Sequence, residues 1–128
     1  MRGMNRRGLR SASERTPSDP VEIEYIVELL RRQGYELWPG ARATVARLHG
    51  SKFRLRRRDY LVVDFVEVLD ILPDDPQSEA PDLLAGRFIP LGYSGGHSVF
   101  FLAEDGTIVE FPSTDDAAPA DFSLESLL

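Results

Sequence analysis

The sequence predicts a single α+β domain, in which helices flank a mostly antiparallel sheet. The N-terminal third carries apolar residues at helical spacing. The C-terminal half carries two runs rich in β-branched and aromatic residues, 98–103 and 107–111, joined through Asp105 and Gly106. An Asp-Gly pair between two such runs is the strongest short-range signal for a β-hairpin. The length of 128 residues is close to the usual size of one domain.

The N-terminal residues differ in composition from the rest of the chain. Residues 1–18 are rich in Arg, Ser and Gly, so they cannot bury enough apolar surface to fold. We therefore predict a disordered basic tail at 1–18 and the folded domain at 19–128. Residues 1–20 carry five arginines and two acidic residues, whereas the whole chain has a net charge of −6. The folded body is therefore acidic, which argues against nucleic-acid binding by it and favours a basic protein partner.

The first helix is predicted to begin at Asp19 and Pro20 and to end at Gly34. Asp19 can cap the helix, Pro20 suits its first position, and Glu22 has the capping-box spacing from Asp19. Gly34 suits the left-handed conformation that ends many helices. The apolar face of this helix consists of Ile23, Ile26, Val27 and Leu30.

A second helix is predicted at 39–48, where Trp38 packs on the core in front of the helix rather than binding a ligand. Strands are predicted at 52–56 and 60–65 from their alternating apolar residues.

The chain from residue 66 onward is less regular. Residues 66–72 fit either a strand or a short helix, with Val66, Leu69 and possibly Val68 facing inward. We then expect a breaker at 73–76, a helical turn at 78–84, a strand at 87–92, a linker at 113–120, and a closing helix capped by Asp121 or Ser123 that packs through Leu124, Leu127 and Leu128.

Two local patterns have alternative interpretations. Arg54, Arg56 and Arg58 could form a stripe that contacts phosphates, but in an acidic body we favour a solvated face paired with carboxylates. Gly95 and Gly96 could let a ligand approach the backbone, but no phosphate-loop signature follows, so a turn is the better interpretation.

The sequence contains no set of residues typical of catalysis or of a metal site. There is no cysteine, and neither His49 nor His97 has the spacing of a zinc ligand from another histidine. We therefore expect no enzyme activity, no cofactor and no metal. No apolar run approaches the roughly 18 residues that a membrane helix needs, so we expect no membrane association.

The densest acidic cluster is the candidate partner-binding site. A solvated loop is the usual explanation of such a cluster. Partner binding is the hypothesis we retain, because the chain shows no other site chemistry. The candidate residues are Asp70, Asp74, Asp75, Glu79 and Asp82.

The order of the motifs resembles the third subgroup of the SUKH superfamily of bacterial immunity proteins. The resemblance rests on a Gly-aromatic helix end at 33–35, a Pro-apolar-Gly strand end at 90–92, an Asp-Gly hairpin at 101–108 and a closing helix at 122–128. It implies a SUKH-like α+β fold with no shared catalytic residues. It also implies a cytoplasmic protein that binds a cognate polymorphic toxin, often a nuclease, and blocks its active surface.

Two other functions remain open. One is a regulatory or scaffold module on the same fold, because a fold does not determine a function. The other is a small nucleic-acid-binding protein that uses the basic tail together with the arginines at 54–58.

Overall fold

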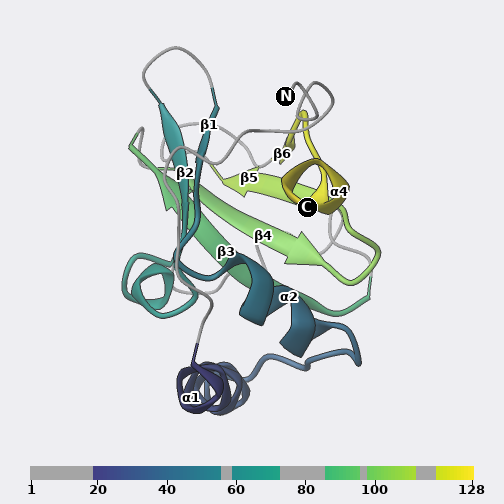
Figure 1. Ribbon diagram of the computed structural model, residues 1–128. Helices are drawn as coiled ribbons and strands as arrows, with labels where there is room; N and C mark the ends of the chain where they lie inside the picture. The colour runs from purple at the N-terminus through teal and green to yellow at the C-terminus, as the bar shows by residue number, and fades with distance from the viewer. Residues whose placement is uncertain (1–18, 56–58, 73–85, 96–97, 112–117) are drawn as a thin grey trace.

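The computed structural model describes residues 19–55, 59–72, 86–95, 98–111 and 118–128 (Figure 1). Within these ranges it is a single α+β domain, so the predicted fold class is confirmed. Six antiparallel strands form one sheet whose strand order follows the chain order. The strands are β1 (Lys52–Arg54), β2 (Tyr60–Val63), β3 (Phe88–Ser94), β4 (Val99–Ala103), β5 (Ile108–Phe111) and β6 (Ala118–Pro119).

Helix α1 (Pro20–Arg32) begins and ends as predicted. The Asp19 side chain accepts a hydrogen bond of 2.8 Å from the Val21 N–H. Gly34 takes the left-handed conformation with φ 96°. At this end the Tyr35 N–H donates to the Leu30 carbonyl at 3.1 Å, which closes the helix with a pair of buried apolar residues.

Helix α2 (Ala41–Leu48) begins two residues later than predicted, because Pro39 and Gly40 form a turn before it. The Ala41 N–H donates to the Trp38 carbonyl at 2.9 Å, and Gly40 has φ −86° and ψ −5°. These angles fit the third position of a type I turn, whose second position favours proline. Trp38 is partly buried and packs against the core, as predicted.

Helices α2 and α4 (Leu124–Leu127) lie over the same face of the sheet (Figure 1). The Phe122 ring lies 5.9 Å from the ring of Phe100 in β4. The Arg47 Nη2 atom in α2 donates to the Leu128 carbonyl at 3.0 Å, which links the two helices. We call this side of the sheet the helix-covered face. Helix α1 packs beside α2 at the lower end of the sheet.

The opposite face changes character from β5 to β1. Near β4 it is apolar, because the Phe101 ring lies 5.8 Å from Phe88 and 5.0 Å from Phe111. All five residues of β4 are buried, as expected for a strand covered on both sides. At β1 the same face carries Lys52 and Arg54, both exposed. On this face, burial therefore decreases from β4 towards β1.

Strands β2 and β3 leave no room for a side chain at Gly92. A Cβ atom at this position would lie 2.0 Å from the Val62 carbonyl oxygen. The register between β3 and β4 shifts between Pro90 and Gly92, next to this contact. Only glycine fits at such a position without moving a backbone.

Several predicted boundaries need correction. Residues 66–72 contain a 3-10 helix, η1 (Glu67–Asp70), which is the short-helix alternative; Val68 is fully buried, and Val66 and Leu69 are partly buried against the core, so all three face inward as expected. The predicted strand at 87–92 continues to Ser94, because Tyr93 and Ser94 pair with β2. Strands β1 and β2 are shorter than predicted at their C-terminal ends.

The C-terminal region holds two further differences. The predicted linker at 113–120 contains β6, which pairs with β5 through Ala118 and Pro119. Leu127 is buried as predicted, but Leu128 is 55% exposed, because it lies at the chain end beyond the last turn of α4. Ser123 is the residue that caps α4, in a capping box with Ser126. The tail at 1–18, the breaker at 73–76 and the helical turn at 78–84 lie outside the described residues.

Candidate functional site

Asp70 is the one predicted partner-binding residue within the described part of the chain. It is the last residue of η1 and is exposed. Glu67, three residues earlier, is also exposed, and residues three apart in a 3-10 helix lie on the same side. The structure therefore brings Glu67 and Asp70 together. Asp74, Asp75, Glu79 and Asp82 lie outside the described residues.

The acidic pair sits on a turn whose backbone is held in place by Asp64. The Asp64 Oδ1 atom accepts hydrogen bonds from the Val66 N–H at 3.0 Å and the Glu67 N–H at 2.8 Å. These are the free N–H groups at the start of a helical turn, which carboxylates satisfy well. Val68 anchors the other side of the turn in the core. Asp64 is a residue that the sequence reasoning missed, although its spacing of three from Glu67 is that of a capping box.

Glu67 ties η1 to the sheet. The Tyr93 hydroxyl, on β3, donates to the Glu67 Oε2 atom at 2.9 Å. Partial burial raises the pKa of the Tyr93 phenol, and the hydrogen bond to Glu67 raises it further. Tyr93 therefore remains a proton donor to Glu67 at neutral pH.

Asp70 lies beside an exposed apolar residue. Ile71 is 47% exposed, which is high for a large aliphatic side chain. Among the residues that the structure describes, no basic group lies within ion-pair distance of Asp70. We define the η1 surface as Glu67, Asp70 and Ile71. It combines negative charge with an apolar side chain on a fixed backbone.

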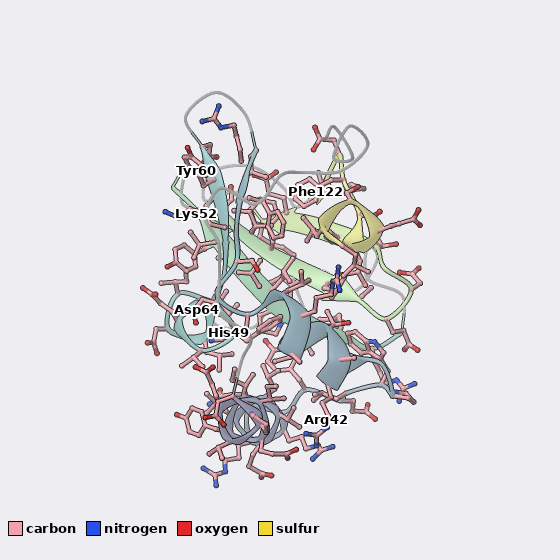
Figure 2. All side chains as sticks on the ribbon, viewed as in Figure 1. Arg42, His49, Lys52, Tyr60, Asp64 and Phe122 are labelled. Atoms are coloured by element: carbon pink, nitrogen blue, oxygen red, sulfur yellow. The ribbon has the colours of Figure 1, made fainter. Side chains whose placement is uncertain are left out.

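A second surface lies at the β1 end of the sheet and contains cations and an aromatic ring. Arg54 belongs to the predicted arginine stripe, whereas Arg56 and Arg58 lie outside the described residues. The Arg54 Nη2 atom donates to the Tyr60 hydroxyl at 3.2 Å, and the Lys52 Nζ atom lies 5.4 Å from the centre of the Tyr60 ring. Figure 2 shows Lys52 and Tyr60 together on β1 and β2.

The expected pairing of this stripe with carboxylates is not found for Arg54. Within the described ranges, neither Arg54 nor Lys52 has a carboxylate at ion-pair distance. Tyr60 takes that role, because its ring lies close to both cations and its hydroxyl accepts from Arg54. The sequence carried a signal for this, because Arg54 and Tyr60 flank a short turn and can pair across two strands.

The histidine that the structure describes has a structural role. His49 follows α2, and its Nδ1 atom accepts a hydrogen bond of 3.4 Å from the Phe65 N–H. Its Nε2 atom lies 3.8 Å from the Glu22 carboxylate, and its ring stacks on Phe65 at 5.9 Å. Glu22 thus approaches His49, in addition to standing at the predicted capping-box position of α1. His97 lies outside the described residues.

The glycine loop is a turn in its described part. The Gly95 N–H donates to the Asp59 Oδ1 atom at 3.1 Å, and the same oxygen accepts from the Tyr60 N–H at 2.9 Å. Asp59 therefore joins the end of β3 to the start of β2. Gly96 lies outside the described residues.

Within the described ranges the chain offers no metal site and no membrane span. The described residues contain no group of three or more His, Cys, Asp or Glu side chains arranged to hold a metal ion. None of the helices in the described ranges has the length and apolar character needed to cross a membrane. No family model, curated protein or solved structure matches this chain.

Proposed function

We propose that this chain is a cytoplasmic immunity protein, similar to the SUKH superfamily, which binds a cognate toxin and blocks its active surface. The observation that carries this proposal is the η1 surface. It presents Glu67 and Asp70 beside the half-exposed Ile71. This surface resembles a protein-binding patch more than a catalytic site, because it offers charge and apolar area on a fixed backbone.

The fixed backbone favours binding. Asp64 holds the start of η1, and Tyr93 holds Glu67 against β3. The η1 surface therefore loses less conformational freedom when a partner docks than a loose loop would. Preorganisation of this kind raises affinity without any added contact.

The charge of the surface favours a basic partner. A nuclease that binds nucleic acid presents a basic surface to the phosphates. An acidic antidote is attracted to that surface during diffusion, which raises the association rate at low salt. Ile71 would then supply apolar contact area at the centre of the interface.

We propose binding rather than catalysis because two of the three carboxylates at η1, those of Asp64 and Glu67, already serve structural contacts, whereas the third, Asp70, is exposed. Asp64 accepts two backbone N–H groups, and Glu67 accepts the Tyr93 hydroxyl. A general base needs a free lone pair aimed at a substrate in a cleft.

The test is co-expression with the toxic domain encoded by a neighbouring gene, followed by purification of the complex. We expect cell survival and a stable complex. The association rate should fall for Asp70→Lys by several-fold at low salt and by less at moderate salt. Ile71→Ser should instead raise the dissociation rate.

The matched control is Glu125→Lys, an exposed acid in α4 that gives the same change of net charge. We expect it to leave the association rate nearly unchanged. Equal effects of the two substitutions would show that net charge, not the η1 surface, governs association. A stable complex without cell survival would favour a regulatory or scaffold module instead.

A further inference from the structure

Strand β1 lies at one end of the sheet and pairs with β2 alone among the described strands. Two hydrogen bonds show which residues of β1 bond to β2. The Val63 N–H donates to the Ser51 carbonyl at 2.9 Å, and the Leu55 N–H donates to the Asp59 carbonyl at 2.9 Å. In an antiparallel ladder, only alternate residues bond to a given neighbour. The Ser51 carbonyl and the backbone hydrogen-bonding groups of Phe53 and Leu55 therefore point towards β2.

The backbone groups of Lys52 and Arg54 consequently point away from β2, at the open edge of the sheet.

Gly50 determines which residues of β1 bond to β2. It has φ 87°, and its N–H donates to the Val63 carbonyl at 2.8 Å, so Gly50 and Ser51 together oppose Val63. This is a β-bulge of the kind that begins with a left-handed glycine, and it fixes the register of β1.

The side chains of the same two residues form a basic pair on one face of this edge. Lys52 and Arg54 are exposed, and both lie on the face that carries Tyr60. The Arg54 Cζ atom lies 5.7 Å and the Lys52 Nζ atom 5.4 Å from the centre of the Tyr60 ring. The ring thus holds both cations close to the backbone groups with which no other described strand pairs. We call Lys52, Arg54 and Tyr60 the β1 edge.

We propose that the β1 edge binds an extended acidic polypeptide as an added antiparallel strand. The backbone of that segment would bond to the N–H and C=O groups of Lys52 and Arg54, as peptides do at other open sheet edges. The acidic side chains of the segment would lie on the Tyr60 face, beside the two cations. This surface is separate from the η1 surface, and the inference does not depend on the proposed function.

Charge selects this occupant over a second copy of the chain. Two β1 strands paired edge to edge would set Lys52 and Arg54 against the same cations of the other copy. Like charges directly opposite each other destabilise a strand pair, and lysine on an edge strand commonly prevents such self-association. An acidic segment turns the same charges into attraction.

The free backbone groups select a polypeptide over a single-stranded nucleic acid. A nucleic acid has no row of N–H and C=O groups to match the open edge. It would also need the Tyr60 face for base stacking, where both cations already lie. The geometry therefore fits a strand better than a base stack.

The probe is a capped peptide of about eight residues with alternating Glu and Val. In the added antiparallel strand, residues opposite Lys52 and Arg54 share their face and point their N–H groups at β1. These residues are the glutamates. N-methylation of the glutamates should abolish binding to the full chain, whereas N-methylation of the valines should leave it intact.

The readout is amide hydrogen exchange together with peptide titration by NMR. We expect the amides of Lys52 and Arg54 to exchange fast in the free protein and to slow on binding, whereas the Phe53 amide is slow throughout. The double variant Lys52→Glu, Arg54→Glu should weaken binding of the Glu peptide on the order of tenfold. The same variant should gain affinity for a matching Lys and Val peptide.

Three results would overturn the proposal. The first is unchanged exchange of the Lys52 and Arg54 amides at saturating peptide. The second is loss of binding that does not depend on which residues are N-methylated. The third is binding of a short oligothymidylate, but not the Glu peptide, at the same residues. The N-methylated peptides act on the unmodified protein, so the test stands even if the double variant fails to fold.

Discussion

Replacing Gly92 by alanine tests the close contact between β2 and β3. The new Cβ atom would lie 2.0 Å from the Val62 carbonyl oxygen and 3.0 Å from the Val63 Cα atom. Both are backbone atoms, so no side-chain rotation relieves the overlap. The two strands must move apart by about 1.5 Å to reach ordinary contact distances.

The expected loss of stability is about 2–4 kcal/mol. Overpacking in a well-packed interior costs about 1–3 kcal/mol, and a lost ladder hydrogen bond adds about 1 kcal/mol. Against a typical total of about 5–15 kcal/mol, this change lowers Tm by on the order of 10 °C. Strand β2 pairs with β1 and strand β3 contacts η1, so both the β1 edge and the η1 surface would lose order if β2 and β3 separated.

The assay is urea unfolding followed by circular dichroism, with wild type and variant fitted for midpoint and slope. The matched control is Gly40→Ala, whose added Cβ would meet only the Trp38 side chain, at 3.7 Å. We expect this control to lose less than about 1 kcal/mol. If Gly92→Ala were as stable as the control, the close approach of β2 and β3 would be refuted.

Three further predictions concern single contacts. Asp64→Ala should lose about 1–2 kcal/mol of unfolding free energy in urea, because two N–H groups at η1 lose their acceptor. Asp64→Asn should retain most of that stability. Equal losses for the two variants would contradict the capping role of Asp64. Burial raises the pKa of Tyr35 from 10.0 to about 12, so the stability of the fold should decrease as pH rises between these values. Tyr35→Phe should reduce this decrease. A Tyr35 titration near pH 10, followed by ultraviolet absorbance, would contradict the prediction. The hydrogen bonds from Arg87 lower the pKa of Glu104 below 4.5, so the wild type should lose stability as pH falls below that value, and Glu104→Gln should show a flatter acid profile in thermal unfolding.

Local signals predicted the parts of the fold whose cause is local. Helix α1 was predictable because Asp19 caps its first turn and Gly34 ends it, and the β4–β5 hairpin because an Asp-Gly turn joins two apolar runs. The ambiguity at 66–72 was real, because Val68 is buried by its contact with the sheet rather than by a helical or strand period.

Non-local contacts account for what the sequence did not predict. Strand β6 is two residues long and contains Pro119, so its own composition does not indicate a strand. It is a strand because it pairs with β5. Tyr60 was expected as a strand residue, but its contact with Lys52 and Arg54 depends on the cross-strand register. Of the predicted acidic site, Asp70 alone falls within the described chain, beside Glu67, which was not predicted.

The chain-order sheet has a consequence for folding kinetics. Each described strand pairs with the next one along the chain, so the sheet can grow by successive closures, of which the longest joins β2 to β3 across residues 64–87. Proteins dominated by such local pairings fold faster than those with crossed connections. Helix α1 adds its apolar face at the margin of this sheet. We expect truncations in β4, such as Leu102→Ala, to slow refolding, and truncations in α1, such as Ile26→Val, mainly to speed unfolding. Stopped-flow chevrons measure both limbs, and a refolding rate equally sensitive to α1 and β4 would mean that the helix joins the sheet before the rate-limiting step.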